Sequence, residues 1–175
     1  MRVSMCGRNA LAVFLILLVP AFSAVSFAST VVVGTCKTGV RFSTIQAALD
    51  AIPAGSTINI CPNTYAEQLH IVQAVTLTGV AVTATGADAI VIVPPAAGLA
   101  ANTNSLASGN PIAAHVWVDN AATVNMNNII VDSSGNAIDS CSPDLIGIYY
   151  QNSSGTLNHV VTRNQFLGTS EANIR

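Results

Sequence analysis

The amino-acid sequence predicts an all-β fold in which short strands stack as successive turns of a coil, preceded by one helix. Runs of three or four alternating apolar and polar residues recur between residues 58 and 161, and no Asn-Gly or Asp-Gly hairpin turn separates them. Strands this short favour a parallel β-helix (solenoid), because each turn hydrogen-bonds to the next and few strand edges are left exposed.

The first 28 residues are expected to be a secretory signal peptide. Arg2 and Arg8 precede the apolar run LAVFLILLVPAF, and Ser26 and Ala28 supply the small residues that a signal peptidase reads. The apolar run is too short for a comfortable transmembrane span. The sequence therefore predicts a secreted protein, extracellular or periplasmic, with one β-helix domain over residues 29–175 and no membrane span in the mature chain.

Composition argues against a nucleic-acid partner. The chain has six Lys and Arg against eight Asp and Glu, and two of the arginines lie in the predicted signal peptide. Four basic and eight acidic residues then remain, a formal charge of about −4, whereas nucleic-acid binding needs a clustered basic surface. Only 8% of residues are charged, which suits an exported β-protein whose surface relies on amides and hydroxyls.

The first expected elements are a β-prone run at residues 31–33 and an amphipathic helix of about two turns. Ser43 is the expected N-cap, with Gln46 as its capping-box partner, and Pro53 and Gly55 end the helix. The apolar stripe at helical spacing consists of Phe42, Ile45, Ala48, Leu49 and Ile52.

After the helix, the chain is expected to form short strands. Their alternating apolar positions are Ile58 and Ile60, Leu69 and Ile71, Val75 and Leu77, Ile90 and Ile92, Val116 and Val118, Val124 and Met126, Ile129 and Val131, Ile146 and Ile148, and Leu157 with Val160 and Val161. Residues 96–111, AAGLAANTNSLASGNP, read as a surface loop. Asn-rich corners between strands suit left-handed backbone.

Three cysteines remain after the signal peptide. Cys36 and Cys61 flank the helix, and a disulfide between them would clip it to the first strand, with Cys141 outside this pair. A zinc site is the alternative, but the sequence has no CxxC pair and no close Cys/His grouping, so no metal site is expected.

A family resemblance is carried by residues 42–79, FSTIQAALDAIPAGSTINICPNTYAEQLHIVQAVTLTG. This stretch resembles the entry region of right-handed parallel β-helix proteins of the pectin-lyase-like superfamily, which includes pectinesterases. The resemblance implies a right-handed coil and a helix that caps its open end. Asn63 stands where the family usually has Gly in a corner, so a positive φ is expected there. Tyr65 is expected to pack by its ring, with its hydroxyl on a polar partner.

Three side chains form the main candidate binding site. His115, Trp117 and Asp119 occupy alternate positions and are expected to share one outward face, where the indole would stack on a sugar ring and the other two would bind hydroxyls. The alternative is that Trp117 covers a neighbouring loop. His70 is interpreted as an ordinary exposed histidine. Glu67 is expected to hold a corner by accepting hydrogen bonds from backbone amides, with a catalytic carboxylate as the alternative.

Asp132 and Arg163 end corresponding strands and are expected to approach one another on neighbouring turns. They are weak catalytic candidates, because an arginine beside a carboxylate could bind a uronate. The pectinesterase pattern requires Gln-Asp-Thr-Leu, but here Phe166 follows Gln165, and the later Asp-Phe-x-Phe-Gly element is absent. No catalytic residue is therefore assigned, and no cofactor is expected.

The C-terminal stretch RNQFLGTSEANIR offers neither an amphipathic helix nor a covering loop. The stack is therefore expected to be incomplete, with an uncapped end that an oligomer partner could cover. The protein is predicted to be non-catalytic, or a degenerate enzyme, and to contact an extracellular polysaccharide. A pectin-like polymer is one candidate for this polysaccharide. The alternatives are a pectinesterase-like or polysaccharide-lyase-like enzyme on uronate polymers, and a structural surface protein or truncated remnant without a ligand.

Overall fold

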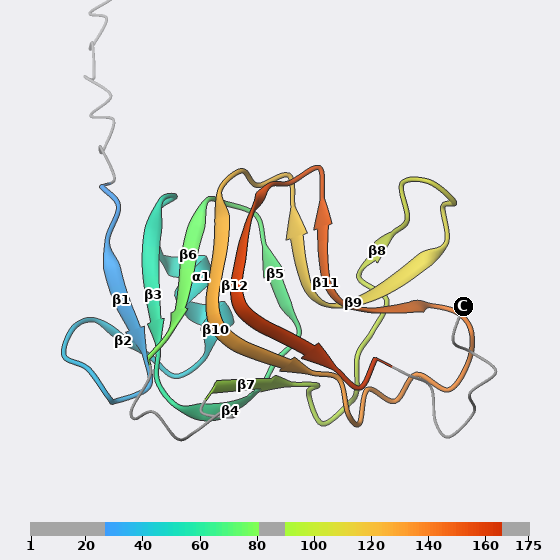
Figure 1. Cartoon of the computed structure of the whole chain (residues 1–175), viewed down its shortest axis with the longest axis horizontal. Coiled ribbons are helices and arrows are strands. Elements are labelled where there is room, and N and C mark those ends of the chain that lie inside the picture. The colour runs from blue at the N-terminus through green and yellow to red at the C-terminus, as the bar shows by residue number, and fades with distance from the viewer. Residues whose placement is uncertain (1–26, 81–89, 166–175) are drawn as a thin grey trace, which may run out of the picture.

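The computed structural model describes residues 27–80 and 90–165, so the predicted signal peptide lies almost entirely outside the described residues, as does the stretch 166–175. The described part of the chain is mostly β, with one helix (Figure 1). In chain order the elements are β1 (Thr30–Val33), β2 (Arg41–Phe42), α1 (Ile45–Ala51), β3 (Ser56–Ile60), β4 (Asn63–Ala66), β5 (Leu69–Ile71), β6 (Val75–Gly79), β7 (Ile90–Val93), β8 (Thr103–Asn104), β9 (Pro111–Asp119), β10 (Val124–Asp132), β11 (Asp144–Gln151) and β12 (Gly155–Arg163). The all-β prediction is confirmed.

Strand pairing is parallel almost throughout the described ranges. The larger sheet has the order β2-β1-β3-β6-β10-β7-β4, with β12 also paired to β10. The smaller sheet has the order β11-β9-β5. Nine of the ten pairings are parallel, and the exception joins β8 to β9. Parallel partners need long connections, which explains why the sequence lacks hairpin turns.

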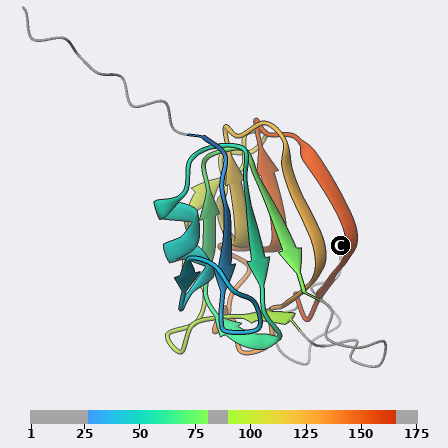
Figure 2. The ribbon, with the colours of Figure 1, turned by 90° about the vertical axis from the view of Figure 1, so that its left-hand side faces the viewer.

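The pairings divide the strands among three faces. The first face contains β1, β3, β6 and the first halves of β10 and β12. The second contains β4, β7 and the later halves of β10 and β12, and the third contains β5, β9 and β11. The chain visits these faces in the same order through β3-β4-β5, β6-β7-β9 and β10-β11, so each visit adds a layer (Figures 1 and 2).

The core lies between the faces and is built from columns of apolar side chains in register. Ile58 of β3 pairs with Leu77 of β6, which pairs with Met126 of β10, and all three are buried. On the third face, Leu69 and Ile71 pair with Val116 and Val118, which are also buried. Each such side chain contributes about 1.5 to 3 kcal/mol through removal from water. Alternation places the intervening side chains on the outside.

Helix α1 packs against the first layer, in contact with β1, β2, β3 and β5 (Figure 2). Its buried residues are Ile45, Ala48 and Leu49, as the apolar stripe predicted. The N-cap is Thr44 rather than Ser43: its hydroxyl accepts a hydrogen bond from the Ala47 amide at 3.2 Å. The prediction of a Ser43–Gln46 capping box is therefore wrong by one residue. The helix ends at Ala51, and its C-cap residue Ile52 is extended because Pro53 follows it.

Asparagines occupy several left-handed corners, as expected. Asn120 follows β9 and Asn152 follows β11, both with φ of 49°. Within β10, Asn128 has φ of 56°, and its counterpart in β12, His159, has φ of 52°, where the strands turn from the first face to the second. Asn63 is a correction: it begins strand β4 opposite Ile90 and is not among the described residues with positive φ.

The segment 96–111 is more than a surface loop. It contains β8, which pairs antiparallel with the start of β9, Thr103 opposite Ile112. The Asn102 side chain bonds both ways with Ala114, accepting from its amide at 3.0 Å and donating to its carbonyl at 2.9 Å. This segment therefore hydrogen-bonds along the first half of β9. No helix within the described ranges is long and apolar enough to cross a membrane.

Candidate functional site

The three residues of the candidate binding site, His115, Trp117 and Asp119, do not share one outward face. His115 is buried, with no exposed surface. Its Nδ1 lies 3.0 Å from the Ser133 hydroxyl and its Nε2 lies 3.0 Å from the Glu67 carbonyl. A carbonyl can only accept, so Nε2 carries the proton and Nδ1 accepts from Ser133. Burial lowers the pKa of His115 and so favours this neutral form. The prediction that His115 points outward to solvent is therefore wrong, because the ring lies between Glu67, just after β4, and Ser133, just after β10.

Trp117 and Asp119 do lie on the outward side of β9, alternating with buried Val116 and Val118. Their partner there is His70 of β5, which pairs directly with Trp117 in the smaller sheet. The two rings stack with centroids 4.0 Å apart and planes 7° apart. We call the outward side of β5, β9 and β11 around these three residues the ring face.

The indole of Trp117 is held in place from the opposite side. Its Nε1–H donates to the Gln151 Oε1 at 3.0 Å, and the Thr103 hydroxyl donates to the same oxygen at 2.7 Å. The Gln151 amide nitrogen donates in turn to the Asn104 carbonyl at 3.0 Å. Gln151 therefore ties the ring on β9 to β11 and to the segment around β8, which limits rotation of the indole.

Asp119 is partly exposed and accepts one strong contact. Its Oδ1 accepts a hydrogen bond from the side-chain amide nitrogen of Asn120 at 2.6 Å, and its side chain is 23% exposed. Its Oδ2 lies 3.7 Å from Nε2 of His70, too far for a hydrogen bond but within the range of an ion pair when the imidazole is protonated. The carboxylate therefore retains lone pairs that can accept from an incoming hydroxyl.

Trp117 has a neighbouring side chain on each side of it in the smaller sheet. His70 covers the face of the indole that is turned to β5, so the other indole face is turned towards β11. Tyr149 of β11 pairs with Trp117 there and is partly exposed. Trp117 therefore lies between His70 of β5 and Tyr149 of β11, with Asp119 two residues further along β9.

The alternation Leu69-His70-Ile71 correctly placed His70 on the outside, but it was not predicted as a site residue. The missing information was the register between β5 and β9, in which His70 pairs with Trp117, 47 positions later in the sequence. Without that register, nothing in the local sequence distinguishes His70 from an ordinary surface histidine.

The expected approach of Asp132 and Arg163 is confirmed. The two residues pair across β10 and β12, and Arg163 Nε donates to Asp132 Oδ2 at 2.7 Å. Asp132 Oδ1 accepts from the Ser134 amide at 2.9 Å and from the Asn164 side chain at 2.8 Å. Burial raises the pKa of Asp132, but hydrogen bonds from Asn164, Ser134 and Arg163 outweigh it and leave that pKa well below its ordinary range.

Glu67 binds backbone amides, as predicted, although these amides belong to the helix. Its two carboxylate oxygens accept from the amides of Ile45 and Gln46, each at 2.8 Å. These amides are at the N-terminus of α1 and have no acceptor within the helix. Glu67 thus joins the end of β4 to the helix that covers the first layer.

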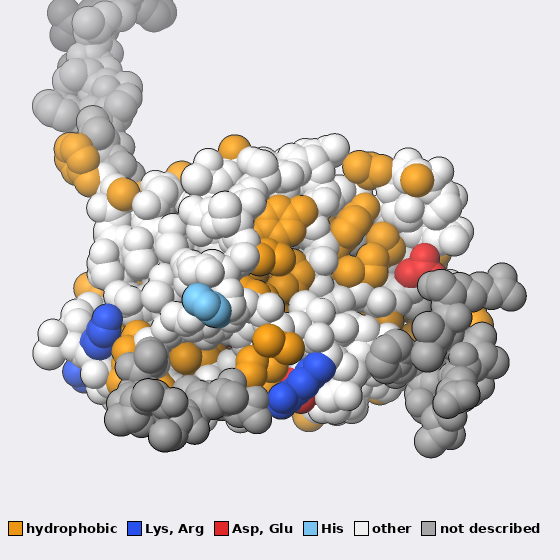
Figure 3. Space-filling view, viewed as in Figure 1, with side chains coloured by type: hydrophobic (Ala, Val, Ile, Leu, Met, Phe, Trp, Pro, Cys, Tyr) orange, Lys and Arg blue, Asp and Glu red, His pale blue; other side chains and the backbone are white. Residues whose placement is uncertain are grey.

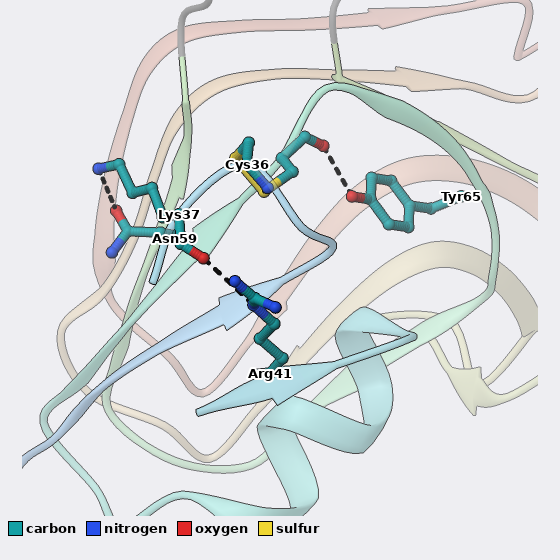
Figure 4. Close-up of a disulfide and its surroundings, with 6 residues drawn as sticks. Cys36, Lys37, Arg41, Asn59 and Tyr65 are labelled. Atoms are coloured by element: carbon teal, nitrogen blue, oxygen red, sulfur yellow. Dashed lines mark hydrogen bonds between the residues drawn. A yellow bond between two sulfur atoms is a disulfide. The ribbon is translucent and has the colours of Figure 1, made fainter. Parts of the chain in front are cut away.

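The disulfide Cys36–Cys61 is confirmed (Figure 4). It joins the end of β1 to the end of β3, and the Tyr65 hydroxyl donates to the Cys61 carbonyl at 2.7 Å beside it. Tyr65 is buried, as expected, and burial, with a smaller contribution from Glu67, raises the pKa of its hydroxyl. Cys141 is exposed. Within the described ranges, no group of three or more His, Cys, Asp or Glu side chains could hold a metal ion.

Comparison of the chain with protein-family models, with curated proteins and with solved structures gave no match.

Proposed function

We propose that this protein is an exported right-handed parallel β-helix of the pectin-lyase-like kind that contacts an extracellular polysaccharide without chemically altering it. The repeated order in which the chain visits three faces, with parallel pairing on each, supports the β-helix. The Cys36–Cys61 disulfide supports an oxidising compartment, because such bonds are rare in reducing ones.

One observation carries the binding proposal: the ring face combines a fixed indole with a partly exposed carboxylate. Trp117 is stacked on His70 and hydrogen-bonded to Gln151, so little rotamer freedom remains to be lost on binding. A sugar can pack its C–H groups on an aromatic ring and donate its hydroxyls to Asp119. A fixed aromatic platform with an adjacent acceptor suits contact with a sugar chain.

The uronate-enzyme alternative is not favoured by the Asp132–Arg163 pair. Each oxygen of Asp132 already accepts a hydrogen bond from the protein, and one donor is Arg163 itself. A substrate group at Asp132 would compete with these three donors, and the contact from Ser134 holds the corner between β10 and residues 133–134. We therefore assign this pair to the stability of the corner.

The test is electrophoresis of protein expressed from the full chain through gels that contain methyl-esterified pectin, unesterified pectin, galactan or xylan. Retardation by at least one polymer is expected, and Trp117→Ala should abolish it, whereas Trp117→Phe should retain part of it. Val40→Ala is the matched control, because Val40 is 64% exposed and lies in the segment between β1 and β2.

Two results would overturn the proposal. Retardation by none of the polymers, or equal retardation of Trp117→Ala and the unchanged protein, would remove the ring face from any binding role. Release of methanol or of unsaturated uronate from pectin would show that the protein is an enzyme. Thermal unfolding of each variant checks that the fold is retained.

A further inference from the structure

The charges around the ring face are all acidic within the described part of the chain. Asp119 lies beside the ring pair. Asp50 is linked to the ring pair through Gln46. The Gln46 side chain donates to the Asp50 carboxylate at 2.8 Å and is also hydrogen-bonded to the backbone of His70. An incoming ligand would therefore meet a negative potential at this face.

The described cations lie elsewhere. Lys37 is in the segment between β1 and β2, and Arg41 begins β2, where its Nε donates to the Lys37 carbonyl at 3.2 Å. Arg163 ends β12 and is bound to Asp132. None of these side chains comes from β5, β9 or β11, so the three strands of the ring face supply no Lys or Arg.

The neutral polar groups near the rings are also poor partners for an anion. The Gln151 oxygen accepts from Trp117 and Thr103, and its nitrogen donates to Asn104, so its amide is already occupied. The indole N–H is used by the same contact. A ligand carboxylate placed beside Asp119 would face a like charge, and β5, β9 and β11 supply no Lys or Arg to offset it, which is unfavourable.

From this distribution we propose that the ring face binds a neutral sugar chain and discriminates against uronate chains. This inference rests on the proposed polysaccharide contact and narrows it to one class of ligand. Hydroxyls can donate to Asp119, whereas an ionised carboxylate offers only acceptors and a repelled charge. In a pectin-like polymer, the methyl-esterified stretches are the matching part, and the free-acid stretches are rejected.

The experiment uses one sugar chain in two charge states: an oligogalacturonide of fixed length and its fully methyl-esterified form. Trp117 is the only tryptophan in the chain, so its fluorescence reports directly on the ring face. At pH 7 and low salt, the ester is expected to bind roughly tenfold more tightly than the acid, and the difference should shrink as salt screens the repulsion.

Asp119→Asn is the decisive variant, with Asp144→Asn as its matched control. Both remove one negative charge from the same sheet, but only Asp119 lies at the ring pair. Asp119→Asn should narrow the difference between ester and acid to less than roughly threefold, mainly by improving binding of the acid. Asp144→Asn should leave the difference in affinity between ester and acid close to that of the unchanged protein.

The outcomes separate the two proposals. If the acid binds as tightly as the ester, or if Asp119→Asn leaves the difference unchanged, the inference of charge discrimination is wrong while polysaccharide contact still stands. If neither form nor neutral galactan changes the fluorescence, and no polymer retards the protein, the proposed function itself fails. Thermal unfolding of Asp119→Asn shows whether the contact with His70 is needed for the fold.

Discussion

The first and last described layers of the stack have the same apolar pattern but differ in how it is covered. Ile58, Leu77 and Met126 form one core column, and the next member of that column in β12 is Leu157. The first three are at most 1% exposed, whereas Leu157 is 51% exposed. Inward orientation alone therefore does not bury a side chain, because burial also needs a layer on each side.

The first layer is held by contacts that come from outside the strands. Helix α1 packs on it, Glu67 binds the N-terminus of the helix, and the Cys36–Cys61 disulfide joins β1 to β3. At the other end, apolar side chains gather over β11 and β12 (Figure 3). Val161 is 50% exposed there, and Ile148, Tyr150 and Val160 are only partly buried. The two ends should therefore differ in local stability.

The largest expected effect tests the column directly. Leu77→Ala should lower the free energy of unfolding by about 3 to 5 kcal/mol, because it leaves a cavity between two filled layers. Leu157→Ala removes the same atoms from a half-exposed position and should cost less than about 1 kcal/mol. Urea unfolding monitored by circular dichroism measures both. Equal costs for the two variants would contradict the difference between the layers.

Removal of the disulfide should have the next largest effect. The double variant Cys36→Ala/Cys61→Ala should lose about 3 kcal/mol of unfolding free energy, because the bridge closes a loop with a sequence separation of 25 residues. The loss should be accompanied by faster amide exchange in β1 and β3 than in β9. Uniform loss of protection across all strands would show that the bridge stabilises the whole stack rather than its first layer.

A smaller effect is expected from Glu67→Gln. The neutral side chain presents one acceptor oxygen in place of two, so one amide at the start of α1 loses its partner, at a cost of about 1 to 3 kcal/mol. Asp144→Asn, an exposed change of the same kind, should cost less than about 0.5 kcal/mol. Hydrogen exchange should locate the change at residues 45–48. If both variants have the same stability, Glu67 does not anchor the helix.

The smallest expected effect concerns His115, at the covered middle of the stack. Burial lowers its pKa, so the folded protein keeps the ring neutral while the unfolded chain takes up a proton below about pH 6.5. The unfolding free energy should therefore fall as the pH decreases from 8 to 5.5, by at most about 1.4 kcal/mol per pH unit. The variant His70→Gln/His159→Gln should keep this slope. A slope that vanishes with those two substitutions would assign the titration to exposed histidines.

Patterns that depend on local alternation were predictable from the sequence. The buried positions of β3, β5 and β6 follow the period of two, and the stripe of α1 follows the helical period. The meeting of Asp132 with Arg163 was also predictable, because β10 and β12 have similar sequences and therefore reveal their own register. In each case the necessary information lay within one segment or in the sequence similarity of two segments.

The burial of His115 and the stacking of His70 on Trp117 were not predicted, because both depend on contacts between dissimilar segments. His115 lies between Glu67 and Ser133, which follow other strands, and no local pattern indicates that these two residues approach it. His70 meets Trp117 only through the register of β5 with β9, and those strands share no recognisable repeat. Asn63 failed for a related reason: the neighbouring strand β7 draws it into the sheet.

The spacing of paired residues has a consequence for how such a chain can change length. Asp119 pairs with Gln151, 32 positions later, whereas Val124 pairs with Gly155, only 31 positions later. The turn after β9 therefore contains one residue more than the turn after β11, and Thr123, with φ of 61°, lies in the longer one. Insertions and deletions can accumulate at this turn over generations while the neighbouring strands keep their partners, so a tandem duplication of one layer would need to match only approximately in length.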